Sequence, residues 1–382
     1  ITVRWNIVRH FYPYYEEDRL DWDNRLERYM QKAVQMAGVN TFESLVEWYD
    51  TLCRFMNPVK DGHMFVRRDM NVSGIMSTYL PEFYAEAETK AVNDTLLVRM
   101  WTDGKQPWRI LNAVNGQQAS ERLQYCRQIT NAATEVHRDK MAAEKMLSSA
   151  EYGTPFVIQT VDASGQTHED TIYAQSQNIK KVEKERQPVK KLENGILYVD
   201  ATSRELNEKL FLSALTPDVR GLCFDLRGLP TYQFEDILAH LIAADAKAPA
   251  TEVAINNFPY QQNVTWRVDS ETLKARQPHI ALPATFLCDG ATVSWGETIL
   301  MMVRHYKLGK IAGQTTAGTT GDMTQFLLPL FPFSMTGMLM RCMDGEPHHA
   351  RGIKPDITIP VYATDYINGY DRILNVALGM DE

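Results

Sequence analysis

The pattern of apolar and polar positions changes twice along the chain. Residues 1–60 place aromatic and aliphatic side chains at helical spacing among acidic ones, which predicts a small helical domain. From about residue 78 to 178 the pattern becomes short apolar runs, such as 96–100 and 155–161, which predict strands. Between these runs, Asn115–Gly116 predicts a tight turn. We therefore expect a compact, mostly β module with one helix in this interval.

From residue 195 onward, short apolar runs alternate with segments of helical period. This is the pattern of a largely parallel sheet that is covered by helices on both faces, and it predicts an α/β fold. A polar, charged stretch at 176–194 is expected to be a linker, and the late part of the chain predicts a β-hairpin with strands at 325–332 and 335–343. The expected domains are 1–75, 76–178 and 179–382. The predicted strands are 195–199, 221–227, 284–288 and 310–313, and the predicted helices are 203–215, 233–246, 293–307 and 364–379.

Composition narrows the function classes. A chain of 382 residues with 44% hydrophobic and 10% aromatic residues is expected to fold into more than one domain. Its formal charge of −8 argues against a nucleic-acid partner, and no apolar run is long enough to cross a bilayer. The 5 cysteines lack CxxC spacing, so neither a zinc site nor a disulfide framework is expected, and no cofactor is implied. Because the chain begins with Ile1, we expect that an N-terminal segment has been removed.

The segment from Ala291 to Glu297 joins a predicted buried strand to a predicted helix, and it contains Ser294. A serine at such a corner can expose its hydroxyl while the helix start offers N–H groups to an oxyanion. Ser294 is therefore a candidate nucleophile. The alternative is structural, because Ser294 and Glu297 also form a Ser-x-x-Glu capping box.

Other segments supply the remaining chemistry. Asp61-Gly62-His63 places an imidazole, the usual base for a serine, at a predicted junction of loop and strand. Asp225-Leu226-Arg227-Gly228 ends a buried strand in a turn whose N–H groups can face an oxyanion. Gly352-Ile353-Lys354-Pro355-Asp356 follows Glu346, His348 and His349. Metal hydrolysis by His348 and His349 is not favoured, because neighbouring side chains on a strand point to opposite faces.

Taken in this order, the motifs resemble the carboxy-terminal processing (tail-specific) serine peptidases, in the branch that resembles the tricorn protease core and interphotoreceptor retinoid-binding protein. The resemblance implies a Clp protease/crotonase-like α/β core, a PDZ-like β module and an N-terminal helical domain. The motifs that carry it are Asp61-Gly62-His63, Val114-Asn115-Gly116, Asp225-Leu226-Arg227-Gly228, Thr292-x-Ser294-x-x-Glu297, Gly313 to Gly318 and Gly352-Ile353-Lys354-Pro355-Asp356.

The resemblance also implies roles for single residues. Ser294 is the nucleophile, and Thr319 stands where one branch has a catalytic lysine, so His63 is the implied base. The N–H groups of Gly228 and Trp295 are the implied oxyanion donors. The family often has an orienting glutamate where this chain has His349. Glu346 and His349 are therefore two alternatives for the third member, and Pro230 removes a backbone donor from the oxyanion turn.

The function implied is a periplasmic or secreted serine endopeptidase that acts on protein or peptide tails by a Ser-His mechanism. The PDZ-like module is expected to capture a peptide by adding it as a strand to a sheet edge. The alternative is a relative with weak or no catalysis that binds a peptide or an apolar ligand in the same cleft. The sequence does not indicate an oligomeric state.

Overall fold

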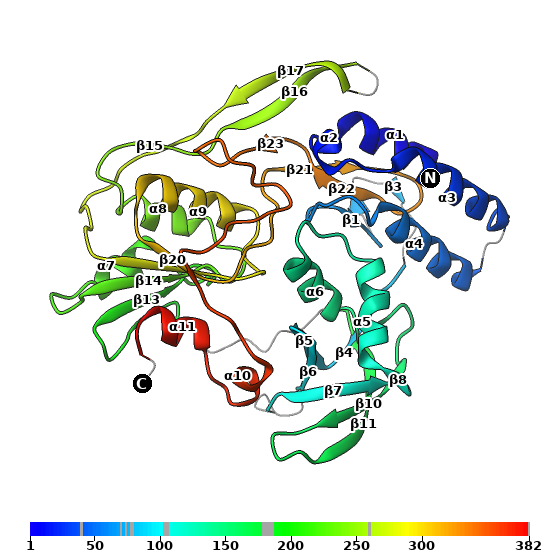
Figure 1. The fold of residues 1–382 in the computed structure, drawn as a ribbon, viewed down its shortest axis with the longest axis horizontal. Helices are drawn as coiled ribbons and strands as arrows, with labels where there is room; N and C mark the ends of the chain where they lie inside the picture. Colours follow the sequence, from blue (N-terminus) through cyan, green and yellow to red (C-terminus); the bar gives the residue numbers. More distant parts are fainter. Residues whose placement is uncertain are drawn as a thin grey trace.

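The computed structural model describes residues 1–38, 41–68, 71–72, 75–76, 80–101, 107–177, 187–258 and 261–380. In Figure 1 the N-terminal helices lie at the upper right, a β module lies below them, and an α/β core lies at the left. The expected boundary between residues 178 and 179, and the centre of the predicted linker, lie outside the described residues. The expected domain boundaries stay predictions.

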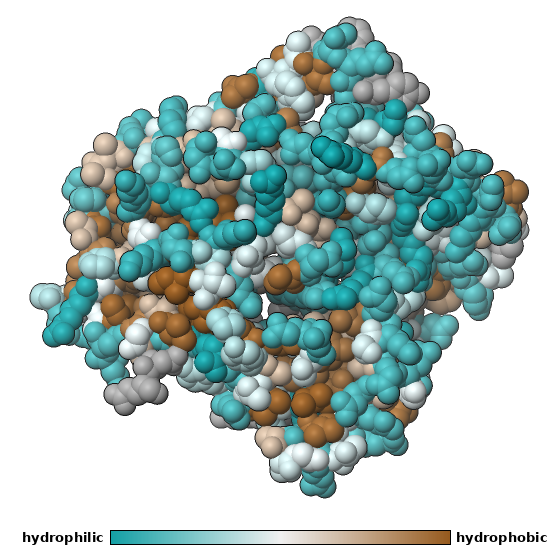
Figure 2. All heavy atoms as spheres, viewed as in Figure 1, coloured by the Kyte–Doolittle hydropathy of each residue, from teal (hydrophilic) through white to brown (hydrophobic). Residues whose placement is uncertain are grey.

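The N-terminal helices form because their aromatic side chains gather on one side. Tyr12, Trp22 and Phe55 are buried in one apolar cluster, together with Phe331 and Phe333 from the late part of the chain. Figure 2 shows that the outer surface of these helices is mainly hydrophilic in this view. The helices are α1 (Thr2–Phe11), α2 (Tyr15–Asp18), α3 (Trp22–Gln35) and α4 (Phe42–Met56).

A late hairpin connects these helices to the rest of the molecule. Strand β22 (Phe333–Thr336) pairs with β21 (Met323–Phe326) and, on its other side, with β1 (Phe65–Val66). The hairpin predicted for this part of the chain is present with shifted strands, because Pro329 and Pro332 occupy the connection and cannot donate to a ladder. The pairing of β1 with β22 brings the segment after His63 beside Thr336.

The β module contains an eight-stranded sheet of order β5-β6-β7-β10-β11-β4-β9, in which β8 pairs with β7. Asn115 and Gly116 form the predicted turn between β7 and β8, and both have positive φ. Two helices cover this module rather than the one predicted: α5 (Ala119–Gln128) and α6 (Glu135–Ala143). The strands are β4 (Phe83–Ala85), β5 (Ala87–Val92), β6 (Thr95–Met100), β7 (Arg109–Val114), β8 (Gln117–Gln118), β9 (Ser148–Ser149), β10 (Pro155–Val161) and β11 (Thr167–Ser176), with a separate pair β2 (Asn71–Val72) and β3 (Ile75–Met76).

The core is a six-stranded sheet of order β12-β13-β14-β19-β20-β24, parallel except for β12. Leu222 and Phe224 of β14 face one apolar cluster, whereas Cys223 between them faces another. Both faces of the sheet are therefore buried, as the continuous apolar runs predict. The strands are β12 (Val189–Lys191), β13 (Ile196–Asp200), β14 (Gly221–Asp225), β19 (Ala284–Cys288), β20 (Lys310–Gly313) and β24 (Ile357–Thr358).

Helices α7 (Glu208–Ala214), α8 (Gln233–Leu238) and α9 (Trp295–Tyr306) belong to the core and confirm the alternating α/β pattern. The helix predicted over 364–379 is instead two helices, α10 (Ala363–Ile367) and α11 (Arg372–Ala377). The break lies at Gly369, whose φ of 68° is left-handed and cannot continue a helix.

A long ribbon extends from the core over the N-terminal helices (Figure 1). It consists of β16 (Thr251–Phe258) and β17 (Gln262–Asp269), and β16 also pairs with β23 (Leu339–Met340). The Gln261 side-chain amide donates to the Tyr12 carbonyl at 2.8 Å, which fixes the ribbon to the end of α1. A short pair, β15 (Ala246–Lys247) and β18 (Thr272–Leu273), lies at its base.

Candidate active site

Three loops leave the same edge of the core sheet, because β14, β19 and β20 are parallel neighbours. The loops follow Asp225, Cys288 and Gly313. They are joined by hydrogen bonds: the Thr292 hydroxyl donates to the Leu226 carbonyl at 2.7 Å, and the Ala317 N–H donates to the Thr292 carbonyl at 3.0 Å. The carboxyl edge of a parallel sheet is where α/β enzymes place their sites.

Ser294 ends the second of these loops and precedes helix α9. Its φ of 56° and ψ of −120° lie where residues with a side chain are rarely found, at a cost of about 1–3 kcal/mol. Its side chain makes no cap hydrogen bond, so the predicted capping box does not form. Strain without a capping role is typical of a reactive serine at the turn from a strand to a helix.

The fully buried Glu297 carboxylate turns away from Ser294 and binds the third loop instead. It accepts hydrogen bonds from the Gly318 N–H and the Thr319 N–H, each at 2.8 Å, and from the Thr316 hydroxyl. Charge-assisted bonds of this kind are stronger than neutral ones. Glu297 therefore fixes the loop at 316–319 against the first turn of α9.

Thr319 connects the serine to the histidine motif. The Ser294 N–H donates to the Thr319 carbonyl at 2.8 Å. The Gly62 N–H donates to the Thr319 hydroxyl, also at 2.8 Å. The backbone of Ser294 and the residue that precedes His63 are thereby bonded to the same threonine.

His63 is held by a chain of hydrogen bonds. Its Nδ1 lies 3.0 Å from the Thr336 hydroxyl oxygen, and that hydroxyl donates its one proton to Asp61 at 2.8 Å. The oxygen must therefore accept from His63, so Nδ1 carries the ring proton and Nε2 has a lone pair. Asp61 is itself fixed by the N–H groups of His63 and Thr336, at 2.8 and 2.7 Å.

The surroundings of His63 favour its neutral form. Burial lowers the pKa of the imidazole, and the negative charges of Asp61 and Glu297 partly oppose this shift. The residue is 6% exposed, and the Ser334 hydroxyl donates to the His63 backbone carbonyl at 2.8 Å. A neutral imidazole of fixed tautomer is the form that a general base requires.

Neither residue expected to orient the imidazole contacts it among the described residues. Glu346 is exposed in a tight turn. His349 Nε2–H donates to the Asp18 carboxylate at 2.8 Å, and the ring stacks on Tyr14 with ring centroids 3.8 Å apart. Contact with the His63 ring is made by Thr336 instead, with Asp61 behind it. His348 points elsewhere, with its Nε2 3.0 Å from Glu297 Oε1, although the two groups are not aligned for a hydrogen bond.

Asp61 and Thr336 are thus candidate supports of the imidazole that the sequence analysis did not identify. The sequence does offer Asp61 as a candidate, because it lies two positions before the candidate base, but its carboxylate binds the His63 N–H and reaches the ring only through Thr336. Thr336 carries no signal of its own in the sequence. It lies 273 residues from His63 and reaches the ring through the pairing of β1 with β22.

The two expected oxyanion donors differ in availability. The Gly228 N–H donates to the Leu226 carbonyl at 2.8 Å, so it is already used. The Trp295 N–H is the first amide of α9, and no hydrogen bond among the described residues uses it. The Pro230 ring packs on this helix start, since a Cβ at Gly296 would lie 3.1 Å from Pro230 Cδ. One of the expected donors is therefore free beside Ser294.

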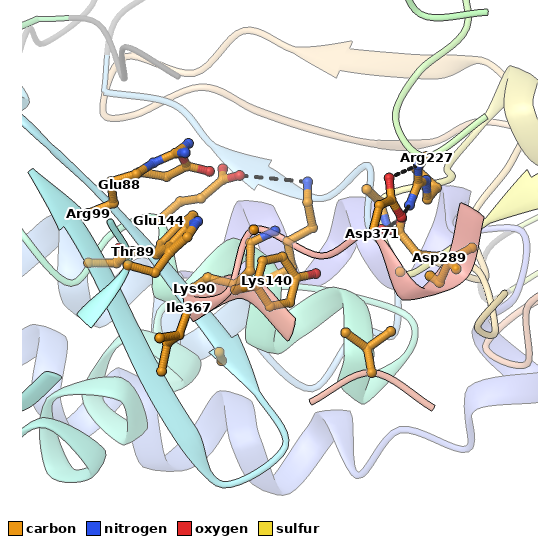
Figure 3. Close-up of a pocket in the computed structure, with 18 of the residues that line it drawn as sticks. Glu88, Thr89, Lys90, Arg99, Lys140, Glu144, Arg227, Asp289, Ile367 and Asp371 are labelled. Atoms are coloured by element: carbon orange, nitrogen blue, oxygen red, sulfur yellow. Dashed lines mark hydrogen bonds and ion pairs between the residues drawn. The ribbon is translucent and has the colours of Figure 1, made fainter. Parts of the chain in front are cut away.

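A cleft of about 810 Å³ lies beside these loops. Gly228 and Ala291 line it from the core, strand β5 and helix α6 line it from the β module, and the segment around α10 and α11 closes its far side. Three ion pairs join charged side chains that line it: Arg99 with Glu88 and, as Figure 3 shows, Lys140 with Glu144 and Arg227 with Asp371.

The described residues contain no cluster of His, Cys, Asp and Glu that could hold a metal ion. Within the same residues, no helix combines the length and the apolarity that a membrane span requires.

Known proteins can now be compared with this geometry. Residues 199–359 match the model of Peptidase family S41. No curated protein sequence matches the chain. The fold is similar to that of mature CPAF, with a TM-score of 0.71 at 12% identity over 96% of this chain and 93% of that chain. It is also similar to a putative peptidase from Parabacteroides merdae, with a TM-score of 0.56 at 15% identity over 98% of this chain and 93% of that chain.

The photosystem II D1 C-terminal processing protease gives a TM-score of 0.51 at 14% identity, over 94% of this chain and 92% of that chain. At these identities the likenesses show the fold, and they confirm the α/β core of Clp protease type. The matched family region contains Ser294, helix α9 and the loop of Thr319. The chain therefore carries a domain of peptidase family S41 over residues 199–359 and is a serine-type peptidase.

Proposed function

We propose that the chain hydrolyses peptide bonds with Ser294 as nucleophile and His63 as general base. The observation that supports this pairing is the shared contact with Thr319, whose carbonyl and hydroxyl hold the Ser294 and Gly62 N–H groups at 2.8 Å each. His63 Nε2, which keeps its lone pair because Nδ1 binds Thr336, takes the proton from Ser294 Oγ. The oxygen then attacks the substrate carbonyl.

The remaining steps use the same groups. The imidazolium formed at His63 is stabilised through its Nδ1–H by Thr336 and, behind it, by the Asp61 carboxylate. The Trp295 N–H donates to the oxyanion. His63 then gives its proton to the leaving amine, and a water molecule activated by the same ring hydrolyses the acyl-enzyme, which restores the Ser294 hydroxyl.

The substrate that we propose is a protein or peptide tail, bound in the cleft between the β module and the core. Strand β5 ends the eight-stranded sheet, and Glu88, Thr89 and Lys90 of this strand line the cleft. The Thr89 hydroxyl donates to the Ala143 carbonyl at 2.5 Å, which holds the strand beside α6. A peptide added as a further strand along β5, in the manner of a PDZ-like module, would extend toward Gly228.

One observation favours a second candidate, a relative that binds peptides without cleaving them. The Gly228 N–H is held by the Leu226 carbonyl, and the rigid Pro230 follows two residues later. An oxyanion hole that lacks one donor typically loses ~10²-fold to 10³-fold in kcat. A protein with this loss would still bind a peptide in the cleft.

A fluorophosphonate probe tests the proposal, because it labels a serine that an adjacent base activates. We expect stoichiometric labelling of the wild type and loss of labelling in Ser294→Ala and His63→Ala. Ser213→Ala and His279→Ala are matched controls, because both side chains are exposed and neither lines the cleft. Mature CPAF has been solved in complex with lactacystin, so lactacystin is a second probe that should compete with labelling.

A digest of casein completes the test. Cleavage that follows the same four variants would support the peptidase. A folded wild type that neither labels nor cleaves, but binds peptides, would replace the leading proposal with the binding protein. Faster cleavage of a peptide with a free carboxyl end than of its amide is expected if tails are the substrate.

A further inference from the structure

Two adjacent threonines hold the backbone of Ser294 on both sides. The Ser294 N–H donates to the Thr319 carbonyl at 2.8 Å, and the Thr320 hydroxyl donates to the Ser294 carbonyl at 3.0 Å. The Thr320 oxygen lies 2.9 Å from the Thr298 hydroxyl, which must be the donor because the Thr320 proton is used. These bonds maintain the unusual φ of 56° at Ser294.

Thr319 also holds the histidine loop. Its hydroxyl accepts the Gly62 N–H at 2.8 Å, and its own N–H donates to Glu297 at 2.8 Å. A Cβ at position 62 would lie 3.0 Å from the Thr319 hydroxyl oxygen, which explains the glycine between Asp61 and His63. Each polar group of Thr319 is therefore bonded, and each bond reaches a different part of the site.

We propose that Thr319 and Thr320 form a clamp that positions Ser294 relative to His63 for proton transfer. Both side chains are buried, and their bonds reach the backbone of Ser294 and of Gly62, so they act by positioning the two proposed catalytic residues. Thr319 stands where one branch of the resembled family has a catalytic lysine. In this chain the same position would hold a residue that positions the proposed nucleophile and its base. The inference rests on the proposed Ser-His mechanism and assigns its positioning residues.

The test replaces hydroxyls while keeping the side-chain shape. Thr319→Val and Thr320→Val remove one hydroxyl each, and Thr319→Ser and Thr320→Ser restore it. Labelling by a fluorophosphonate is followed over a range of probe concentrations, which separates the maximal rate from the half-saturating concentration. We expect each valine variant to lower the maximal rate by ~10-fold to 100-fold, as a misplacement on the order of 1 Å does, with unchanged half-saturation.

Thr160→Val is the matched control. Thr160 is a fully buried threonine of the β module whose hydroxyl has no hydrogen-bond partner in the described part of the chain, so its valine variant should label at the wild-type rate. If Thr319→Val does not fold, the labelling rates of Thr319→Ser and Thr319→Ala are compared instead, because serine and alanine also differ by one hydroxyl.

The outcomes separate the clamp from the proposed function. A serine variant that keeps the wild-type rate beside a slow valine or alanine variant supports the clamp. Folded valine variants that label at the wild-type rate, or serine variants as slow as valine, overturn the clamp and leave the Ser-His mechanism standing. A wild type that neither labels nor cleaves overturns the mechanism and the clamp with it.

Discussion

Replacing Thr336 by valine removes the contact that fixes the His63 ring while keeping the shape of the side chain. The wild-type hydroxyl accepts from His63 Nδ1 at 3.0 Å and donates to Asp61 at 2.8 Å. Valine leaves the Nδ1–H without an acceptor in a buried position. Asp61 keeps its bonds to the N–H groups of residues 63 and 336, so the loop itself stays in place.

The size of the effect follows from what the hydroxyl does in each state. A hydrogen bond to a charged group contributes about 1.5–3 kcal/mol, and the imidazolium forms during attack by Ser294. Since 1.36 kcal/mol is a factor of ten in rate, Thr336→Val should lower kcat by about tenfold to 150-fold. The buried, unsatisfied Nδ1–H should also cost about 1–3 kcal/mol of stability. Because the charged ring loses a favourable contact, the pKa of His63 should fall further.

The assay is the pH profile of kcat/KM for casein-derived or fluorogenic peptides, with urea unfolding of the same variants. Thr336→Ser keeps the hydroxyl and is expected to restore most of the rate, which a purely structural defect would not allow. The reasoning would be refuted by a folded Thr336→Val variant that keeps the wild-type kcat and the wild-type acid limb of the pH profile, provided that Ser294→Ala and His63→Ala are inactive. The ring would then be oriented by something other than Thr336.

Other consequences can be measured in the same preparations. Because burial lowers the pKa of His63 from its ordinary value of 6.5, activity should rise with pH and reach half its maximum below 6.5. Between the lowered pKa of His63 and 6.5, the unfolded chain binds more protons than the folded chain. The free energy of unfolding, measured in urea, should therefore keep its full His63 contribution above pH 6.5 and lose it as the pH falls through the lowered pKa. Arg227→Met leaves the fully buried Asp225 without the cation that lies 2.7 Å away, and should destabilise the fold by about 3–5 kcal/mol in urea; a wild-type midpoint would contradict this. Gly62→Ala should reduce labelling of the serine with little change in peptide binding, because its Cβ would press on the Thr319 hydroxyl, and an unchanged labelling rate would refute that contact.

The sequence predicted those parts of the site that lie within single motifs. The position of Ser294 between a buried strand and a helix is confirmed, because both are present as β19 and α9, whereas its role as nucleophile stays a prediction. The turn at Asn115–Gly116 follows from local backbone preferences in the same way. The local pattern did not predict that the helix expected over 364–379 is interrupted at Gly369, because the helical period of apolar residues continues across the break.

The support of the imidazole could not be predicted, because it depends on contacts between distant strands. Glu346 and His349 are near the expected motif in sequence, but the turn at 342–346 exposes the first, and the Asp18 carboxylate holds the second against the N-terminal helices. Thr336 is one residue of an ordinary strand. Its role follows from the register Phe65↔Ser334, which no property of either strand alone determines.

The position of His63 therefore depends on packing outside the region that matches the peptidase family. Residues 199–359 contain Ser294, Trp295 and Thr336, whereas the base and Asp61 come from the N-terminal part of the chain. Their loop is held by the pairing of β1 with β22, and β22 is in turn buried against the aromatic cluster that includes Trp22 and Phe55. Because the proposed nucleophile lies within residues 199–359 and the proposed base outside them, the S41 region alone would retain the serine corner without its proposed base. Catalysis by the proposed mechanism thus requires the N-terminal helices as a structural element.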